Sequence, residues 1–252
     1  MILQNETILL CGGEERNYKK CLQLDKGTWR EHSTLNMSRI GHSAVATQTA
    51  TFFFGGILSN TTYEYLPKDS NTWLTGKTNI PGGFHSGCAI ASKSESEIWL
   101  IGGSTCGRRI LRFNVNDHTF HSTPSRLNVR RNEPRCAFIP KTNKIMITGG
   151  FHTPTATWLD STEMLDTEDG SITMASPMNF KRDGHGIGIV TIGNEDKLAV
   201  VGGKDGDIIT HSEYHRAEFF NTQSKEWEIT NALPVVHKDF GFLSVKLADI
   251  FF

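Results

Sequence analysis

The sequence predicts an all-β repeat protein, a β-propeller of four-stranded antiparallel blades. A glycine pair closes a short apolar run five times along the 252 residues, and successive pairs begin 43 to 53 residues apart. Between the pairs lie short alternating segments cut off by turn formers, which is typical of strands, and no window has the 3.6-residue periodicity of a long helix. A regular spacing of this size indicates stacked repeats. The glycine pairs are Gly12-Gly13, Gly55-Gly56, Gly102-Gly103, Gly149-Gly150 and Gly202-Gly203.

The apolar run before each glycine pair predicts the second strand of a blade. Two glycines at a strand end permit positive φ and a close approach of backbone. A phosphate-binding loop is the alternative, but no Lys-Ser/Thr and no helix-opening Gly-x-Gly-x-x-Gly pattern follows the pairs. We therefore expect the glycines to be structural.

The third strand is predicted by an alternating segment that ends in an acid, an amide or a proline. An aromatic residue follows 17 or 18 residues after the first glycine at Trp29, Trp73 and Phe120, and later at Trp227. A polar stretch then leads into a strand of small residues, as expected where several copies crowd around an axis. The third strands are Leu22–Asp25, Tyr63–Pro67, Leu111–Asn114, Glu163–Asp166 and Glu218–Asn221, and the small-residue strands are 42–46, 85–90, 136–139, 185–190 and 240–245.

A twisted sheet of four short strands cannot bury both faces alone, so copies must stack, and a radial array covers every face. The glycine pair, the downstream Trp and the run Met37–Ala44 together resemble kelch repeats. The resemblance covers essentially the whole chain and implies a kelch β-propeller. Repeats three and four depart from it, with Phe120 in the Trp position, Ile172 near that position and Arg135 where His42 would align.

We expect a single domain over residues 1–252 with five blades. Blade 1 (about 1–36) opens with a second strand at Thr7–Leu10 and is closed by a carboxyl-terminal strand at 240–245. The further blades are expected at about 37–79, 80–127, 128–178 and 179–231. Six blades are the alternative if the chain is a truncated ring, because residues 248–252 align with the start of another second strand.

The net charge of −1 disfavours nucleic acid as a partner. No apolar run approaches the roughly 18 residues of a membrane span, and the first residues lack a secretory signal pattern. We therefore expect a cytoplasmic monomer without a membrane partner. An extracellular alternative rests on Cys11 and Cys21, which lie on consecutive strands of one hairpin, and on sequons at Asn5, Asn36 and Asn60. The opposing interpretation, which fits the cytoplasmic setting, is that the five cysteines are reduced thiols in the core.

Catalysis is not expected, and neither is a cofactor or a bound metal. His42, His85 and His185 are assigned to one repeat position and so predicted to be structural. No close pair of Cys or His stands opposite another as zinc requires, and the pair His211 and His215 alone is a weak signal. Galactose oxidase also resembles kelch proteins and carries copper on Tyr and His, but the four tyrosines form no recognisable copper set. No nucleophile elbow is present.

A binding surface is expected at the end of the blades where the loops between strands two and three meet the links between blades. Arg108, Arg109, Arg130 and Arg131 are predicted to gather there and to bind an acidic peptide. The alternative is that Arg126, Arg131 and Arg135 are solvated or pair with Glu133 and neighbouring acids. Arg39 and Arg182 share a repeat position and are expected to be structural. The predicted partner-binding residues are Arg16, Tyr18, Arg108, Arg109, Arg130, Arg131, Arg135, His152, His211 and Tyr214.

The predicted function is therefore non-catalytic binding of a protein or peptide partner, as the recognition part of a larger protein. Kelch relatives serve as substrate adaptors of ubiquitin ligases through a separate BTB module, which this sequence does not contain. The alternative is an extracellular kelch-type protein that binds a ligand or glycan, or a diverged copper oxidase.

Overall fold

The structure is a computed structural model that describes residues 2–4, 7–13, 19–192, 195–205 and 216–232. The chain divides into two compact units, Met1–Pro124 and Ser125–Phe252, and the boundary falls inside strand β12. No helix in the described ranges is long and apolar enough to cross a membrane.

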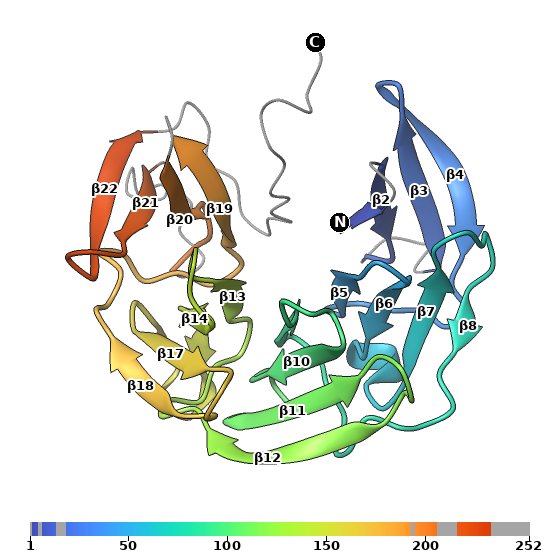
Figure 1. Cartoon of the computed structure of the whole chain (residues 1–252), viewed down its shortest axis with the longest axis horizontal. Coiled ribbons are helices and arrows are strands. Elements are labelled where there is room, and N and C mark those ends of the chain that lie inside the picture. Colours follow the sequence, from blue (N-terminus) through green and yellow to red (C-terminus); the bar gives the residue numbers. More distant parts are fainter. Residues whose placement is uncertain (1, 5–6, 14–18, 193–194, 206–215, 233–252) are drawn as a thin grey trace. The chain divides into compact units, whose positions relative to one another are not determined.

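The first unit holds three antiparallel four-stranded sheets, each a consecutive run of strands (Figure 1). We number the sheets as blades 1 to 5 in chain order. Short loops join neighbouring strands, and one 3-10 helix, η1 (Ile57–Ser59), lies in the loop between β6 and β7. The strands are β1 (Ile2–Gln4), β2 (Thr7–Cys11), β3 (Lys20–Asp25), β4 (Thr28–Thr34), β5 (Ser43–Ala46), β6 (Ala50–Phe54), β7 (Tyr63–Pro67), β8 (Leu74–Thr75), β9 (Cys88–Ala91), β10 (Glu97–Ile101), β11 (Arg109–Asn114) and β12 (Phe120–Arg126).

The second unit holds blades 4 and 5, together with a two-stranded ribbon in the loop between the second and third strands of blade 4. Blade 4 has the strand order β13-β14-β17-β18, and the ribbon pairs β15 with β16. The elements are β13 (Arg135–Phe138), β14 (Lys144–Thr148), β15 (Phe151–His152), η2 (Thr153–Thr155), β16 (Thr157–Trp158), β17 (Thr162–Asp166), β18 (Ile172–Ala175), β19 (Gly186–Ile192), β20 (Glu195–Val201), β21 (Arg216–Asn221) and β22 (Glu226–Ala232).

The first strand of blade 1 differs from the sequence prediction. The chain was expected to begin with a second strand, but Ile2–Gln4 pairs with β2 in the register Ile2↔Leu9 and fills the first position. Three residues are too short to show the alternation on which the prediction depended. The predicted closing strand at 240–245 lies outside the described residues.

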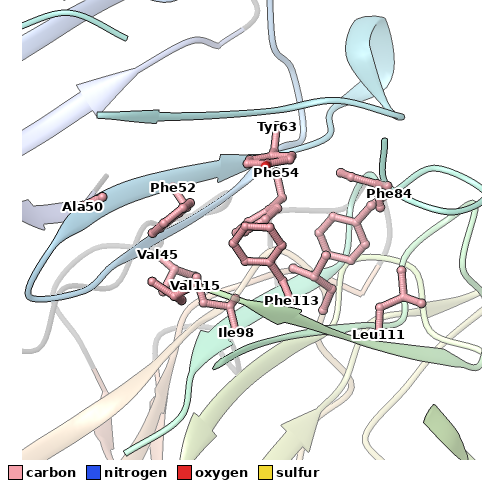
Figure 2. Close-up of a cluster of buried hydrophobic side chains, with 12 residues drawn as sticks. Val45, Ala50, Phe52, Phe54, Tyr63, Phe84, Ile98, Leu111, Phe113 and Val115 are labelled. Carbon is pink, nitrogen blue, oxygen red and sulfur yellow. The ribbon is translucent and has the colours of Figure 1, made fainter. Parts of the chain in front are cut away.

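The apolar side chains of neighbouring sheets pack into shared cores. Phe52, Phe54 and Tyr63 of blade 2 lie against Phe113 of blade 3, with ring centroids 5.0 to 5.5 Å from the Phe113 ring (Figure 2). A second cluster joins Leu9 of blade 1 to residues of blade 2 such as Phe53. The faces between blades 1 and 2 and between blades 2 and 3 therefore depend on the neighbouring blade for their burial, as the repeat argument requires.

Candidate functional site at the loop ends of the blades

The glycine pairs of blades 1, 2 and 4 each attach their blade to the link that enters the next blade. A Cβ on Gly55, whose φ is +65°, would lie 1.6 Å from the carbonyl oxygen of Phe84. The adjacent Gly56 N–H donates to that same oxygen at 3.0 Å. The equivalent bonds from Gly13 and Gly150 run to the carbonyls of Arg39 and Arg182. These glycines have a structural role, as the sequence predicted.

Arg39 lies in the link that enters blade 2 and is fully buried. Its Nε donates to Glu64 Oε1 at 3.0 Å, and its Nη1 donates to the carbonyl of Gly55 at 2.6 Å. Glu64 also accepts from the backbone N–H groups of Asn36 and Met37, which fixes the start of the link. Burial lowers the pKa of Arg39, and the Glu64 carboxylate opposes that shift. An arginine remains protonated in such a site, so the ion pair is charged.

Blades 4 and 5 repeat this arrangement. Arg131 Nε donates to Glu163 Oε1 at 3.1 Å, and Arg182 Nε donates to Glu218 Oε1 at 3.2 Å. All four side chains are completely buried. The assignment of Arg131 to the partner-binding surface is therefore wrong, because its buried guanidinium donates hydrogen bonds to Glu163 and to the carbonyls of Gly149 and Ser161. The structural role predicted for Arg39 and Arg182 is confirmed.

Blade 3 replaces the ion pair with two apolar residues. The Phe84 carbonyl accepts from Gly56 as the Arg39 carbonyl accepts from Gly13, so Phe84 takes the arginine position. Leu111 takes the glutamate position, three residues before the end of β11. Both side chains are completely buried in the cluster shown in Figure 2. The site tolerates either a charged or an apolar pair of complementary size.

The three histidines do not occupy one repeat position, which corrects the prediction. Phe54 and Val201 are each the last residue before a glycine pair. Their strand partners are the residues that directly follow His42 and His185. In blade 3 this place belongs to Gly87, so His85 does not share the repeat position. His185 is completely buried and its Nε2 lies 2.7 Å from Thr148 Oγ1. Burial holds its pKa well below the usual value, with the nearby charge of Arg135 adding to the shift, so the ring is neutral.

In the first unit, the loop between the second and third strands of blade 3 presents Arg108, which is exposed. Arg109 is half-buried, and its Nη2 donates to the carbonyl of Gly83 at 3.1 Å and lies 3.2 Å from Cys106 Sγ. Arg109 therefore holds the loop of blade 3 against the link that enters that blade. Arg108 is the side chain of this pair that faces solvent.

In the second unit, the β15–β16 ribbon extends from the loop end of blade 4. Its Phe151 and Trp158 rings lie 5.1 Å apart, and Trp158 Nε1 donates to Asp183 Oδ2 at 3.1 Å. Asn132 of the entering link pairs with Phe151 as an isolated bridge. His152 Nδ1 lies 2.6 Å from Thr155 Oγ1, so the predicted His152 helps to close the ribbon turn.

Two more of the predicted arginines lie near the buried Arg131 in sequence. Arg130 is exposed in the link that holds Asn132, and Arg135 is half-buried as the first residue of β13. Arg108 and Arg109 belong to the first unit, so their gathering with Arg130 stays a prediction. Arg16, Tyr18, His211 and Tyr214 lie outside the described residues.

Cys11 and Cys21 form a disulfide between directly paired residues of β2 and β3. The bridge that the hairpin spacing suggested is therefore present. Cys106 is a free, half-buried thiol. Among the described residues, no group of three or more His, Cys, Asp or Glu side chains is placed to hold a metal ion.

Comparison with solved structures identifies the fold. The structure of YjhT is 12% identical to this chain, covers 94% of it and 84% of its own length, and superposes with a TM-score of 0.77. The fold is a five-bladed β-propeller. A fungal alcohol oxidase of the AA5 family, in complex with copper, superposes with a TM-score of 0.71 at 15% identity, over 93% of this chain and 53% of the oxidase. No protein-family model matches the propeller, and no curated protein matches it.

The oxidase overturns one prediction. The absence of familiar catalytic motifs led to the prediction that the chain is not an enzyme, but this propeller fold also occurs in an alcohol oxidase with bound copper. The absence of catalytic motifs from a divergent repeat protein is weak evidence against catalysis, because catalytic side chains on such scaffolds come from scattered loops. That prediction is therefore withdrawn.

Proposed function

We propose that this chain is a kelch-type propeller that binds an acidic segment of a protein or peptide partner at the loop ends of its blades. The observation that carries the proposal is the exposure of Arg108, in the loop between the second and third strands of blade 3, and of Arg130, in the link that enters blade 4. The glycine pairs and the aromatic residue of the fourth strand support the kelch assignment.

Rigidity of the loop ends lowers the entropic cost of binding. The blade 4 ribbon is fixed by the contact between Trp158 and Asp183, and the blade 3 loop by the bond from Arg109 to Gly83. The exposed ribbon residues 153–157 include three threonines, whose hydroxyls add hydrogen-bonding groups at the loop end of blade 4. Arginine suits carboxylates because its planar fork donates two parallel hydrogen bonds.

The test is a titration of fluorescein-labelled peptides, one rich in Asp and Glu and one rich in Lys, followed by anisotropy. The variant Arg108→Glu/Arg130→Glu should weaken binding of the acidic peptide at least about tenfold, since charged hydrogen bonds contribute about 1.5–3 kcal/mol each. The matched control is Lys93→Glu/Lys141→Glu, which makes the same charge change at exposed turns between first and second strands. Equal losses in both variants, or no preference for the acidic peptide, would overturn the proposal.

A disulfide within a core hairpin supports an extracellular rather than a cytosolic setting, because cytosolic thiols are kept reduced. We therefore place the binding of the acidic segment outside the cell. Copper analysis of the purified protein tests the oxidase alternative directly. Stoichiometric copper would favour the oxidase alternative over the binding proposal. Copper-free protein that binds the acidic peptide would support the binding proposal.

A further inference from the structure

The loop of blade 2 carries a sequon, Asn60-Thr61-Thr62, directly after η1. Asn60 is partly exposed and Thr61 is exposed. The backbone carbonyl of Asn60 accepts from Phe84 N–H at 2.7 Å, but its side-chain amide makes no hydrogen bond within the described part of the chain. The amide lies over Gly83, since a Cβ built there would lie 3.3 Å from Asn60 Nδ2, but no hydrogen bond within the described residues holds the nitrogen in place.

The sequon at Asn36 is different because the fold uses its amide. Asn36 Nδ2 donates to the carbonyl of Trp73 at 2.9 Å and to Thr75 Oγ1 at 3.3 Å. A glycan on this nitrogen would replace one of the two N–H groups and force the link away from β8. The third sequon, at Asn5, lies outside the described residues.

The repeats supply an internal control for Asn36. Asn128 and Asn179 stand at the same place in blades 4 and 5, each donating its backbone N–H to the buried glutamate of its blade. Asn179 Nδ2 also donates to the carbonyl of Trp227 at 3.0 Å. Neither residue begins a sequon, so the fold alone accounts for the asparagine at position 36.

The comparison with another blade shows that the fold does not require an asparagine at position 60. Its equivalent in blade 4 is Leu159, whose carbonyl accepts from the Arg182 N–H at 3.0 Å as the Asn60 carbonyl accepts from Phe84. The fold thus requires only a backbone carbonyl at this position. The neighbouring Ile57 and Leu58 are 56% and 59% exposed, an apolar pair that an attached oligosaccharide would cover.

We propose that Asn60 is an N-glycosylation site and that Asn36 is not. The donor is a lipid-diphosphate-linked oligosaccharide. Asn60 Nδ2 attacks the anomeric carbon, the bond from that carbon to the diphosphate oxygen breaks, and a carbon–nitrogen bond forms. The nitrogen releases one proton and the lipid diphosphate leaves, so no oxidant or reductant is involved. The site rests on the extracellular setting proposed above.

The test expresses the full chain behind an added signal peptide in a eukaryotic secretory host. Glycosidase treatment in ¹⁸O-water followed by tryptic mapping reads each site separately, because cleavage after Arg39 parts Asn36 from Asn60. We expect labelled aspartate at position 60 and unmodified asparagine at position 36. Asn60→Gln should lose one glycan and keep the wild-type melting temperature, whereas Asn36→Gln should keep that glycan and lower the melting temperature.

Two results would overturn the site: no modification of Asn60 in secreted, folded protein, or a glycan on Asn36 in protein with a wild-type melting temperature. The Cys11–Cys21 bridge, mapped in the same sample, separates this failure from failure of the proposed setting. Bridged protein without a glycan at Asn60 rejects the site alone, while reduced protein rejects the setting on which the site depends.

Discussion

Arg39 Nε lies 3.0 Å from Glu64 Oε1, and neither side chain reaches solvent. Together they connect two blades, because the Arg39 carbonyl accepts from Gly13 of blade 1 while its guanidinium binds Gly55 of blade 2. Removing either side chain would leave the charge of the other one buried without a counter-charge. Blade 3 performs the same packing with Phe84 and Leu111, so the charge itself is not required by the fold.

Arg39→Phe and Glu64→Leu should each lower the free energy of unfolding by about 3–5 kcal/mol, because each leaves an uncompensated buried charge. The double variant copies blade 3 and should lose less than the two single losses added together. Urea denaturation measures all three. A double variant at least as unstable as that sum would show that the pair is not replaceable by apolar packing.

Gly55→Ala should destabilise the protein far more than Gly27→Ala. Both glycines have positive φ, +65° and +79°, so both substitutions carry the left-handed strain of about 1–2 kcal/mol. Only the Cβ at position 55 would meet a backbone oxygen, while nothing lies within 4 Å at position 27. Thermal melts compare the two variants. Equal shifts would mean that the contact with Phe84 does not constrain the glycine.

The repeat itself was predictable from sequence, because glycine pairs and alternating segments are local signals. The buried role of Arg131 was not, since arginine is usually exposed and its partner Glu163 is distant in sequence. A signal did exist: Glu64, Glu163 and Glu218 each stand three residues before the end of a predicted third strand. A glutamate recurring in core strands, with an arginine in the preceding link, indicates a buried pair.

The position of His85 was misjudged for a related reason. The prediction aligned histidines by their neighbours, whereas strand pairing places Gly87 where His42 and His185 stand. The link into blade 3 differs in length, and only the hydrogen-bond register reveals it. Loop-end side chains are the least predictable part, because sequence gives their order along the chain but not their exposure.

Replacing Cys11 and Cys21 by serine should lower the free energy of unfolding by about 2–3 kcal/mol, the loss expected for a bridge that closes a short loop. Digestion without reduction should yield the two cysteines in one cross-linked product and alkylated Cys106 separately. Recovery of alkylated Cys11 from folded, unreduced protein would contradict the bridge and the extracellular setting.

Acid should destabilise the protein partly through His185. Its pKa in the folded state lies below the usual value of about 6.5, so below that pH the unfolded chain binds a proton that the folded chain does not. Stability should fall with pH by up to about 1.4 kcal/mol per unit from this group. His185→Gln should flatten the slope of melting temperature between pH 7 and pH 5. An unchanged slope in His185→Gln would show that the ring titrates normally.

The measurement that tests the central claim most directly is hydrogen exchange with and without the acidic peptide. Binding at the loop ends should protect residues 104–109 and 130–135 and leave the opposite turns at 92–96 and 140–143 unchanged. Protection confined to those opposite turns, or spread evenly over both ends, would contradict recognition at the loop ends of the blades.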